Sequence, residues 1–200
     1  MDLDTEKILK RFEDYIYYNT QSDEENDQVY PSTPGQMVLA RHLKEELEQL
    51  GLQEVSLDEN GYVMATLPAN GAEGSVVGFI SHMDTSPDAP GGPIHSRVVH
   101  DYDGKDICLN KEKNIVLSTK DFPEILKYKG QDIIVTDGTT LLGADDKAGV
   151  TAIVSAMEYL LHHREVKHGK IRIAFTPDEE TGRSPLRFDV KKFHADFAYT

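Results

Sequence analysis

Three short segments of this sequence carry histidine and acidic side chains that could bind a metal ion. The segment SHMDTSPD contains His82 and Asp84, LLGADDKAG contains Asp145, and FTPDEETGR contains Glu179 and Glu180. Imidazole and carboxylate groups together form the ligand set of hydrolytic zinc centres. Each segment alone is weak support, because Asp145 could cap a helix and the glutamate pair could be solvated. The interpretation therefore depends on whether the fold brings the three segments together.

His82 and Asp84 are two residues apart, so in extended chain their side chains point the same way. The carboxylate could hold one ring nitrogen and leave the other free for a metal ion. The pair could alternatively belong to a serine-type triad. No G-x-S-x-G turn is present, and Ser81 and Ser86 lie in no such turn. The pattern therefore favours a metal ligand over a triad.

The surrounding elements alternate between helices and strands. Apolar stretches at 75–81, 133–135 and 170–176 indicate strands, and each is followed by one of the acidic segments. Helices are expected from Asp4-Thr5 onward, from Thr33-Pro34 to Gly51, and after Asp145, with a hairpin joining 54–57 to 62–67. Ligands of open α/β sheets lie outside the carboxyl ends of strands. We therefore predict an α/β fold, a mixed sheet sandwiched by helices, with the three segments at one edge.

The region from 85 to 130 contains several prolines and glycines and shows no clear periodicity. We expect an irregular segment there, and its length favours an active-site wall over a linker.

Composition limits the partners and the compartment. The formal net charge of −14 predicts repulsion of nucleic acids and anionic membrane surfaces. The N-terminus lacks a basic region followed by an apolar one, so we expect a soluble, cytoplasmic protein. The single cysteine, Cys108, excludes an internal disulfide and a cysteine-based zinc site, and we expect a buried, inert thiol.

The three segments, in this order and spacing, resemble the dinuclear-zinc metallopeptidase family that includes carboxypeptidase G and the aminoacylases. Further stretches, STPGQMVLARHLKEELEQLG and FDVKKFHADFAYT, extend the similarity over essentially the whole chain. The resemblance implies an aminopeptidase that cleaves tripeptides and binds two Zn²⁺ ions about 3.5–4 Å apart. Small peptides are the implied partners, and a homo-oligomer is possible.

The same resemblance implies a role for each residue of the site. His82 would bind one zinc ion, Asp145 would bridge both, and Glu180 would bind the other. Asp84 and Glu179 would serve catalysis, Asp84 by orienting His82 and Glu179 as the general base. The bond between Asp145 and Asp146 is implied to be cis.

The family pattern also calls for a further aspartate and a second histidine that these 200 residues do not contain. We therefore expect residues 1–200 to be the N-terminal part of a discontinuous catalytic domain, without its lid or dimerisation domain and its C-terminal segment, and to be inactive alone. Two alternatives stay open. A related carboxypeptidase, dipeptidase or deacylase would use the same metal core, and a metal-free binding domain would keep the fold without turnover.

Overall fold

The computed structural model describes residues 3–200, and the chain divides into two compact units. Unit 1 comprises the chain up to Asp88 together with Gly143–Thr200, and unit 2 comprises Ala89–Leu142. All five predicted site residues belong to unit 1.

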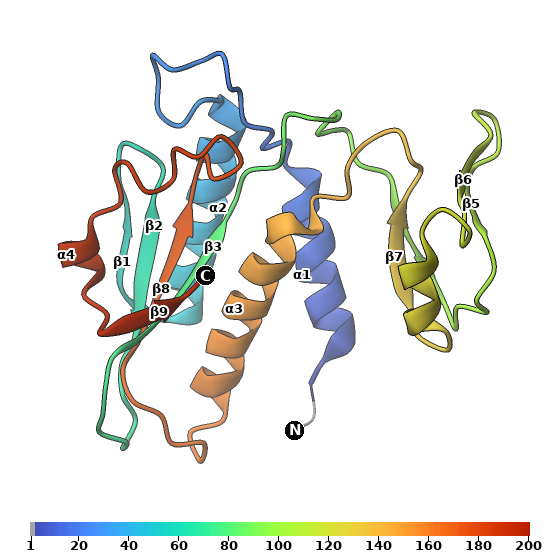
Figure 1. Ribbon diagram of the computed structural model, residues 1–200. Coiled ribbons are helices and arrows are strands. Elements are labelled where there is room, and N and C mark those ends of the chain that lie inside the picture. The colour runs from blue at the N-terminus through green and yellow to red at the C-terminus, as the bar shows by residue number, and fades with distance from the viewer. Residues whose placement is uncertain (1–2) are drawn as a thin grey trace. The chain divides into compact units, whose positions relative to one another are not determined.

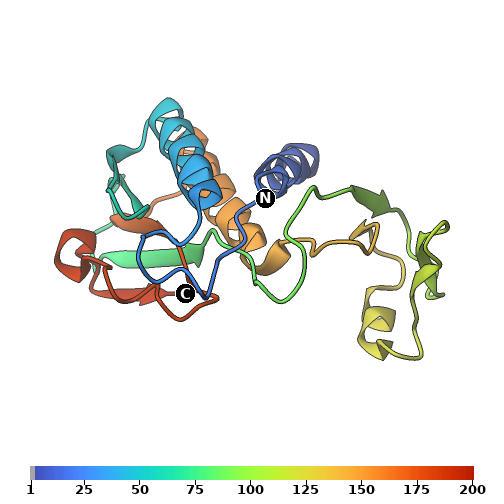
Figure 2. The same cartoon turned by 90° about the horizontal axis from the view of Figure 1, so that it is seen from above.

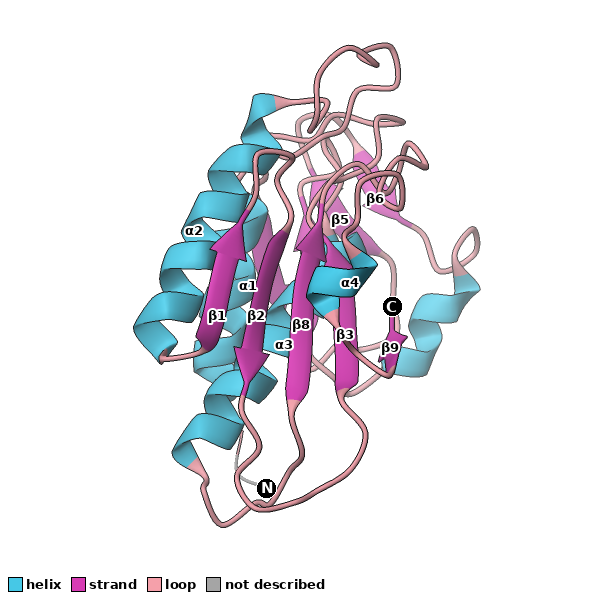
Figure 3. Cartoon of the chain, turned by 90° about the vertical axis from the view of Figure 1, so that its left-hand side faces the viewer, coloured by secondary structure: helices cyan, strands magenta, loops and turns pink. Residues whose placement is uncertain are grey.

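Unit 1 is built around a five-stranded sheet with the strand order β1-β2-β8-β3-β9. β8 pairs antiparallel with β2 and parallel with β3, so the predicted mixed sheet is confirmed (Figure 3). Its strands are β1 (Gln53–Leu57), β2 (Val63–Leu67), β3 (Val77–His82), β8 (Ile171–Thr176) and β9 (Phe197–Tyr199).

Helices cover both faces of this sheet, but unequally (Figures 1 and 2). Alternation along β8 directs Ile173 and Phe175 into the large core with the three long helices, while Ala174 packs on the other face against Phe193 of the short α4. The helices are α1 (Thr5–Tyr17), α2 (Pro34–Leu50), α3 (Ala144–His162) and α4 (Val190–Phe193).

Local signals in the sequence set the element ends as expected. The Asp4 carboxylate caps α1 by accepting a hydrogen bond from Lys7 N at 3.0 Å. α2 begins at Pro34 and ends at Leu50, and it is capped by Gly51, whose φ of 90° is the left-handed conformation that terminates a helix without side-chain strain. The hairpin turn between β1 and β2 is held by Asp58, whose Oδ1 accepts from Asn60 N and Tyr62 N at 3.0 Å each.

Unit 2 departs from the sequence-based prediction. The region expected to be irregular contains strands and a 3-10 helix around a small core of Tyr102, Ile107 and Val135. These elements are β4 (Ser96–Val99), β5 (Ile107–Asn110), β6 (Ile115–Leu117) and η1 (Pro123–Tyr128). Strands of three or four residues are too short for a periodic pattern to emerge, so the prediction of irregular chain was wrong.

Two further expectations about unit 2 require correction. The strand predicted at 133–135 exists as β7 (Ile133–Thr136), but it pairs with β4 in a separate two-stranded sheet and not in the main sheet. Cys108 is exposed, because Ile107 on the same strand points into the small core and the alternation turns its neighbour outward.

None of the helices in the described part of the chain combines the length and the apolar character that a bilayer span requires.

Candidate functional site

Parallel pairing brings two of the three segments to one edge of the sheet. His82 is the last residue of β3 and is in register with Thr176, the last residue of β8. Both strands run in the same direction, so the chain that follows β8, which carries Glu179 and Glu180, leaves the sheet beside His82.

The third segment arrives at the N-terminus of α3, and not from a strand of the main sheet. Ser81 Oγ, one residue before the end of β3, donates a hydrogen bond to Asp146 Oδ2 at 2.5 Å. Gly149 leaves room for this contact, since a Cβ atom there would overlap both Ser81 Oγ and Asp146 Oδ1. The bond between Asp145 and Asp146 is cis, as the family resemblance implied. The Ser81 hydroxyl group is therefore bonded to Asp146 and not to His82, which disfavours a serine triad.

The structure brings His82, Asp145 and Glu180 together. One ligand atom from each lies within 4.8 Å of the others, a spacing compatible with a metal centre. The Asp145 side chain is 87% exposed and the His82 side chain 10%, so the open side of the cluster is formed by the carboxylate. Their role as metal ligands stays a prediction.

Hydrogen bonds fix the orientation of the His82 ring. Nδ1 lies 3.0 Å from the backbone oxygen of Asp84, which can only accept, so Nδ1 carries a proton. Nε2 lies 3.0 Å from Asp145 Oδ1 and 3.7 Å from Glu179 Oε2. The nitrogen suited to a metal ion therefore faces the acidic cluster.

The electrostatic environment favours positive charge at this point. Burial alone would lower the pKa of His82, but the hydrogen bond and charge of Asp84, aided by Glu179 and Asp145, raise it to about 9. Burial raises the pKa of Glu180, and the negative charges of Asp145, Asp84 and Glu179 add to this rise against the opposing effect of His82. A bound cation would relieve the same repulsion between carboxylates.

Asp84 does more than the sequence indicated. Its side chain is fully buried, with Oδ1 3.5 Å from His82 Nδ1. Oδ1 also accepts from Glu179 N at 2.9 Å, and Oδ2 accepts from Glu180 N at 3.1 Å. One carboxylate thus positions the imidazole and the backbone of both glutamates.

Two buried groups near the site were not predicted. Lys147 donates to Tyr18 O at 2.7 Å, and burial lowers its pKa to about 7 against the charge of Asp84. Asp178, directly before the glutamates, is fully buried and bonded to Ser32 and Gln36. Its type and its position after β8 were visible in the sequence, but these partners come from α2 and the loop before it, which no local pattern connects to it.

Known proteins resemble this chain closely over most of its length, although no family model matches it. Peptidase T from Clostridium botulinum is 61% identical over 194 residues, which are 96% of this chain and 47% of the relative. Peptidase T from Listeria innocua is 59% identical over 196 residues, 98% of this chain and 48% of the relative. The chain therefore spans about half the length of the curated relatives it matches.

Solved structures show the same fold. Aminopeptidase PepT from Bacillus cereus superposes with a TM-score of 0.67 at 23% identity, covering 98% of this chain and 43% of that one. A tripeptidase from Staphylococcus aureus superposes with a TM-score of 0.66, also at 23% identity, with the same coverage. The fold and the sequence similarity agree: over nearly its whole length, this chain is similar to about half the length of the peptidase T relatives.

Proposed function

We propose that this chain provides part of the active site of a metal-dependent aminopeptidase that removes the N-terminal residue from tripeptides. The observation that carries the proposal is the convergence of His82, Asp145 and Glu180 within 4.8 Å, with Glu179 Oε2 3.7 Å from the same imidazole. The identity of about 60% to proteins named peptidase T supports the choice of reaction.

The donor set fits zinc. One imidazole nitrogen and two carboxylates are ligands that zinc accepts, and the raised pKa values of His82 and Glu180 show a field that favours a cation. We propose that His82, Asp145 and Glu180 would hold the zinc, with Asp145 able to contribute both of its carboxylate oxygens. Bound zinc supplies a water molecule of lowered pKa and polarises the scissile carbonyl.

Two residues of the chain would perform the proton transfer and the positioning. Glu179 would take a proton from the attacking water molecule and pass it to the leaving amine, as a general base and then a general acid. The Asp84 carboxylate accepts a hydrogen bond from the backbone N–H of Glu179 and so holds that residue in place. The backbone oxygen of Asp84 keeps the His82 ring in the tautomer with Nδ1 protonated. No residue of this set forms a covalent intermediate in the proposed reaction.

We further propose that these 200 residues are the N-terminal part of a discontinuous catalytic domain whose other ligands lie in the half of the relatives that the chain does not cover. The test joins the chain to the segment of the Clostridium botulinum relative left uncovered by the alignment, giving what we call the completed enzyme. The 200-residue chain alone is assayed beside it.

The completed enzyme should bind two zinc ions by elemental analysis and release the N-terminal residue from a tripeptide, as judged by product chromatography. The 200-residue chain should release none, because its ligands alone leave both ions incompletely coordinated. Release of the C-terminal residue would indicate a carboxypeptidase. A completed enzyme that is folded but binds no metal would support the metal-free binding domain.

A further inference from the structure

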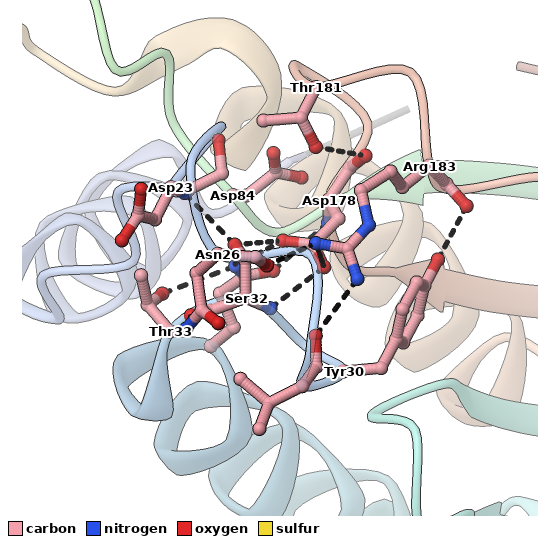
Figure 4. Close-up of polar contacts among 12 residues, drawn as sticks. Asp23, Asn26, Tyr30, Ser32, Thr33, Asp84, Asp178, Thr181 and Arg183 are labelled. Carbon is pink, nitrogen blue, oxygen red and sulfur yellow. Dashed lines mark hydrogen bonds and ion pairs between the residues drawn. The ribbon is translucent and has the colours of Figure 1, made fainter.

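Two buried carboxylates, Asp84 and Asp178, anchor the loop that carries Glu179 and Glu180. The first belongs to the site already described. The second contacts neither His82 nor Asp145 among the interactions of the described residues. Figure 4 shows the Asp178 side chain between the segment that contains Ser32 and the segment that contains Arg183.

Asp178 is fully buried, and each of its carboxylate oxygens accepts at least one hydrogen bond. Oδ2 accepts from Ser32 N at 2.8 Å, and Oδ1 accepts from Ser32 Oγ at 2.5 Å and from Gln36 Nε2 at 2.7 Å. The nearest cation is Arg183, with Nη1 4.0 Å from Oδ2. Ser32 and Gln36 are themselves buried, so these bonds are shielded from water.

Gln36 makes a reciprocal pair with Asp178. Its amide nitrogen donates to the carboxylate, and its amide oxygen accepts from Asp178 N at 3.0 Å. This pair holds Asp178 with a φ of 53°, in the left-handed region, which aspartate adopts more readily than most residues that have a Cβ atom. The left-handed residue turns the chain as it leaves β8.

This turn sets the backbone conformation of the next two residues, Glu179 and Glu180. Three successive backbone N–H groups are bonded to buried side chains: Asp178 N to Gln36, and Glu179 N and Glu180 N to Asp84. The Asp178 carbonyl oxygen accepts from Arg183 N at 2.9 Å and closes the far side of the loop. The direction in which the two glutamate side chains leave the backbone is thereby fixed.

We propose that Asp178 is a positioning residue, which through Ser32 and Gln36 of a distant segment fixes the backbone of the general base Glu179 and the zinc ligand Glu180. The inference rests on the proposed function only for what the two glutamates do. The alternative is that Asp178 contributes stability alone, by tying the loop before α2 to the loop after β8.

Two variants test the proposal in the completed enzyme. Asp178→Asn keeps the size of the side chain, but its NH₂ group faces either Ser32 N–H or the donor of Gln36, so one hydrogen bond is lost in either orientation. Gln36→Leu is a substitution on α2, and it removes both hydrogen bonds between Gln36 and Asp178. Tyr15→Phe is the matched control, because it removes a partly buried hydrogen bond to Glu46 that does not touch the loop.

Two readouts separate positioning from stability. Amide hydrogen exchange reports on Glu179 N–H and Glu180 N–H independently of turnover. We expect both variants to accelerate exchange at these two amides by about 10-fold or more relative to the amides of α3. Tripeptide kinetics should show kcat reduced by roughly 10- to 100-fold, the effect of a small misplacement of a reacting group, with KM changed less than about threefold.

Each outcome decides a separate point. Exchange that changes only as it does in Tyr15→Phe, uniformly with global stability, would overturn the positioning of the glutamate backbone. Faster exchange at the Glu179 and Glu180 amides alone, with an unchanged kcat, would overturn the importance of Asp178 for the reaction. Selective exchange in an enzyme whose wild type cleaves no tripeptide would refute the proposed function and leave the positioning role standing.

Discussion

Replacing Asp84 by asparagine should weaken zinc binding without unfolding the protein. The carboxylate uses both oxygens, accepting from Glu179 N at 2.9 Å and from Glu180 N at 3.1 Å, and Oδ1 also lies 3.5 Å from His82 Nδ1. Asparagine has one oxygen, so its NH₂ group must face one of the two backbone N–H groups. The variant therefore leaves a donor unsatisfied in a fully buried position.

The expected loss of zinc affinity follows from the hydrogen bonds that the asparagine cannot accept. A buried donor without a partner costs about 1–3 kcal/mol. The backbone oxygen of Asp84 still accepts from His82 in the variant, so the effect comes from the lost carboxylate charge beside the imidazole and from the weakened hold on the glutamate backbone. The loss of such an outer partner lowers metal affinity by about 10- to 100-fold, which corresponds to roughly 1.4–2.7 kcal/mol. We expect an affinity loss in this range for Asp84→Asn, measured by competition with a chromophoric zinc chelator in the completed enzyme.

Asp58→Asn is the matched control. Asp58 also accepts two backbone N–H groups, from Asn60 and Tyr62, but both bonds end on Oδ1, which asparagine retains. This variant should keep both zinc affinity and stability. Unchanged affinity in Asp84→Asn, or an equal loss in Asp58→Asn, would refute the argument from the two carboxylate oxygens.

Three further predictions concern the base, the packing of α3 and the pH dependence of stability. Glu179→Gln should abolish nearly all tripeptide turnover and leave the zinc content unchanged; loss of zinc would instead make Glu179 a ligand. Gly149→Ala should destabilise the fold by about 1–3 kcal/mol in urea unfolding, because its methyl group displaces the Asp146 carboxylate. Burial acts to raise the pKa of Glu158, but hydrogen bonds from two basic side chains of α1, one of them Arg11 at 2.8 Å, hold it below its ordinary value. The stability it contributes is therefore present above about pH 4.5 and lost as the pH falls through the folded pKa, and Glu158→Gln should flatten that part of the acid unfolding curve.

The sequence predicts four strands of the main sheet and the three long helices because their signals are local, whereas the short β9 and α4 were not predicted. The apolar stripe and the cap at Asp4, the proline and glycine that bound α2, and the Asn-Gly turn near Asp58 each act within a few residues. The candidate metal ligands were also accessible, since parallel strands bring their carboxyl ends to one edge.

The contacts that complete the site could not be predicted in the same way. Asp178 meets Ser32 across 146 residues of sequence, and Asp84 meets Glu179 across 95. A buried carboxylate selects its partners by tertiary position, and any pair of polar residues in the sequence would have been an equal candidate. The other strands of unit 2 escaped prediction for a different reason, since strands such as β6 (Ile115–Leu117) are too short to carry a period.

The distribution of hydrogen-bond donors around the site explains how so many acids can share it. Asp84 and Asp178 are stabilised largely by backbone N–H groups and neutral side chains, which satisfy a carboxylate without cancelling its charge. Lys147 lies near Asp84, but burial lowers its pKa to about 7, so at neutral pH it supplies less than a full positive charge. The imidazole of His82 therefore offsets only part of the negative charge that Asp145 and Glu180 bring to this point, and a divalent cation is the group whose charge and ligand preference match that position.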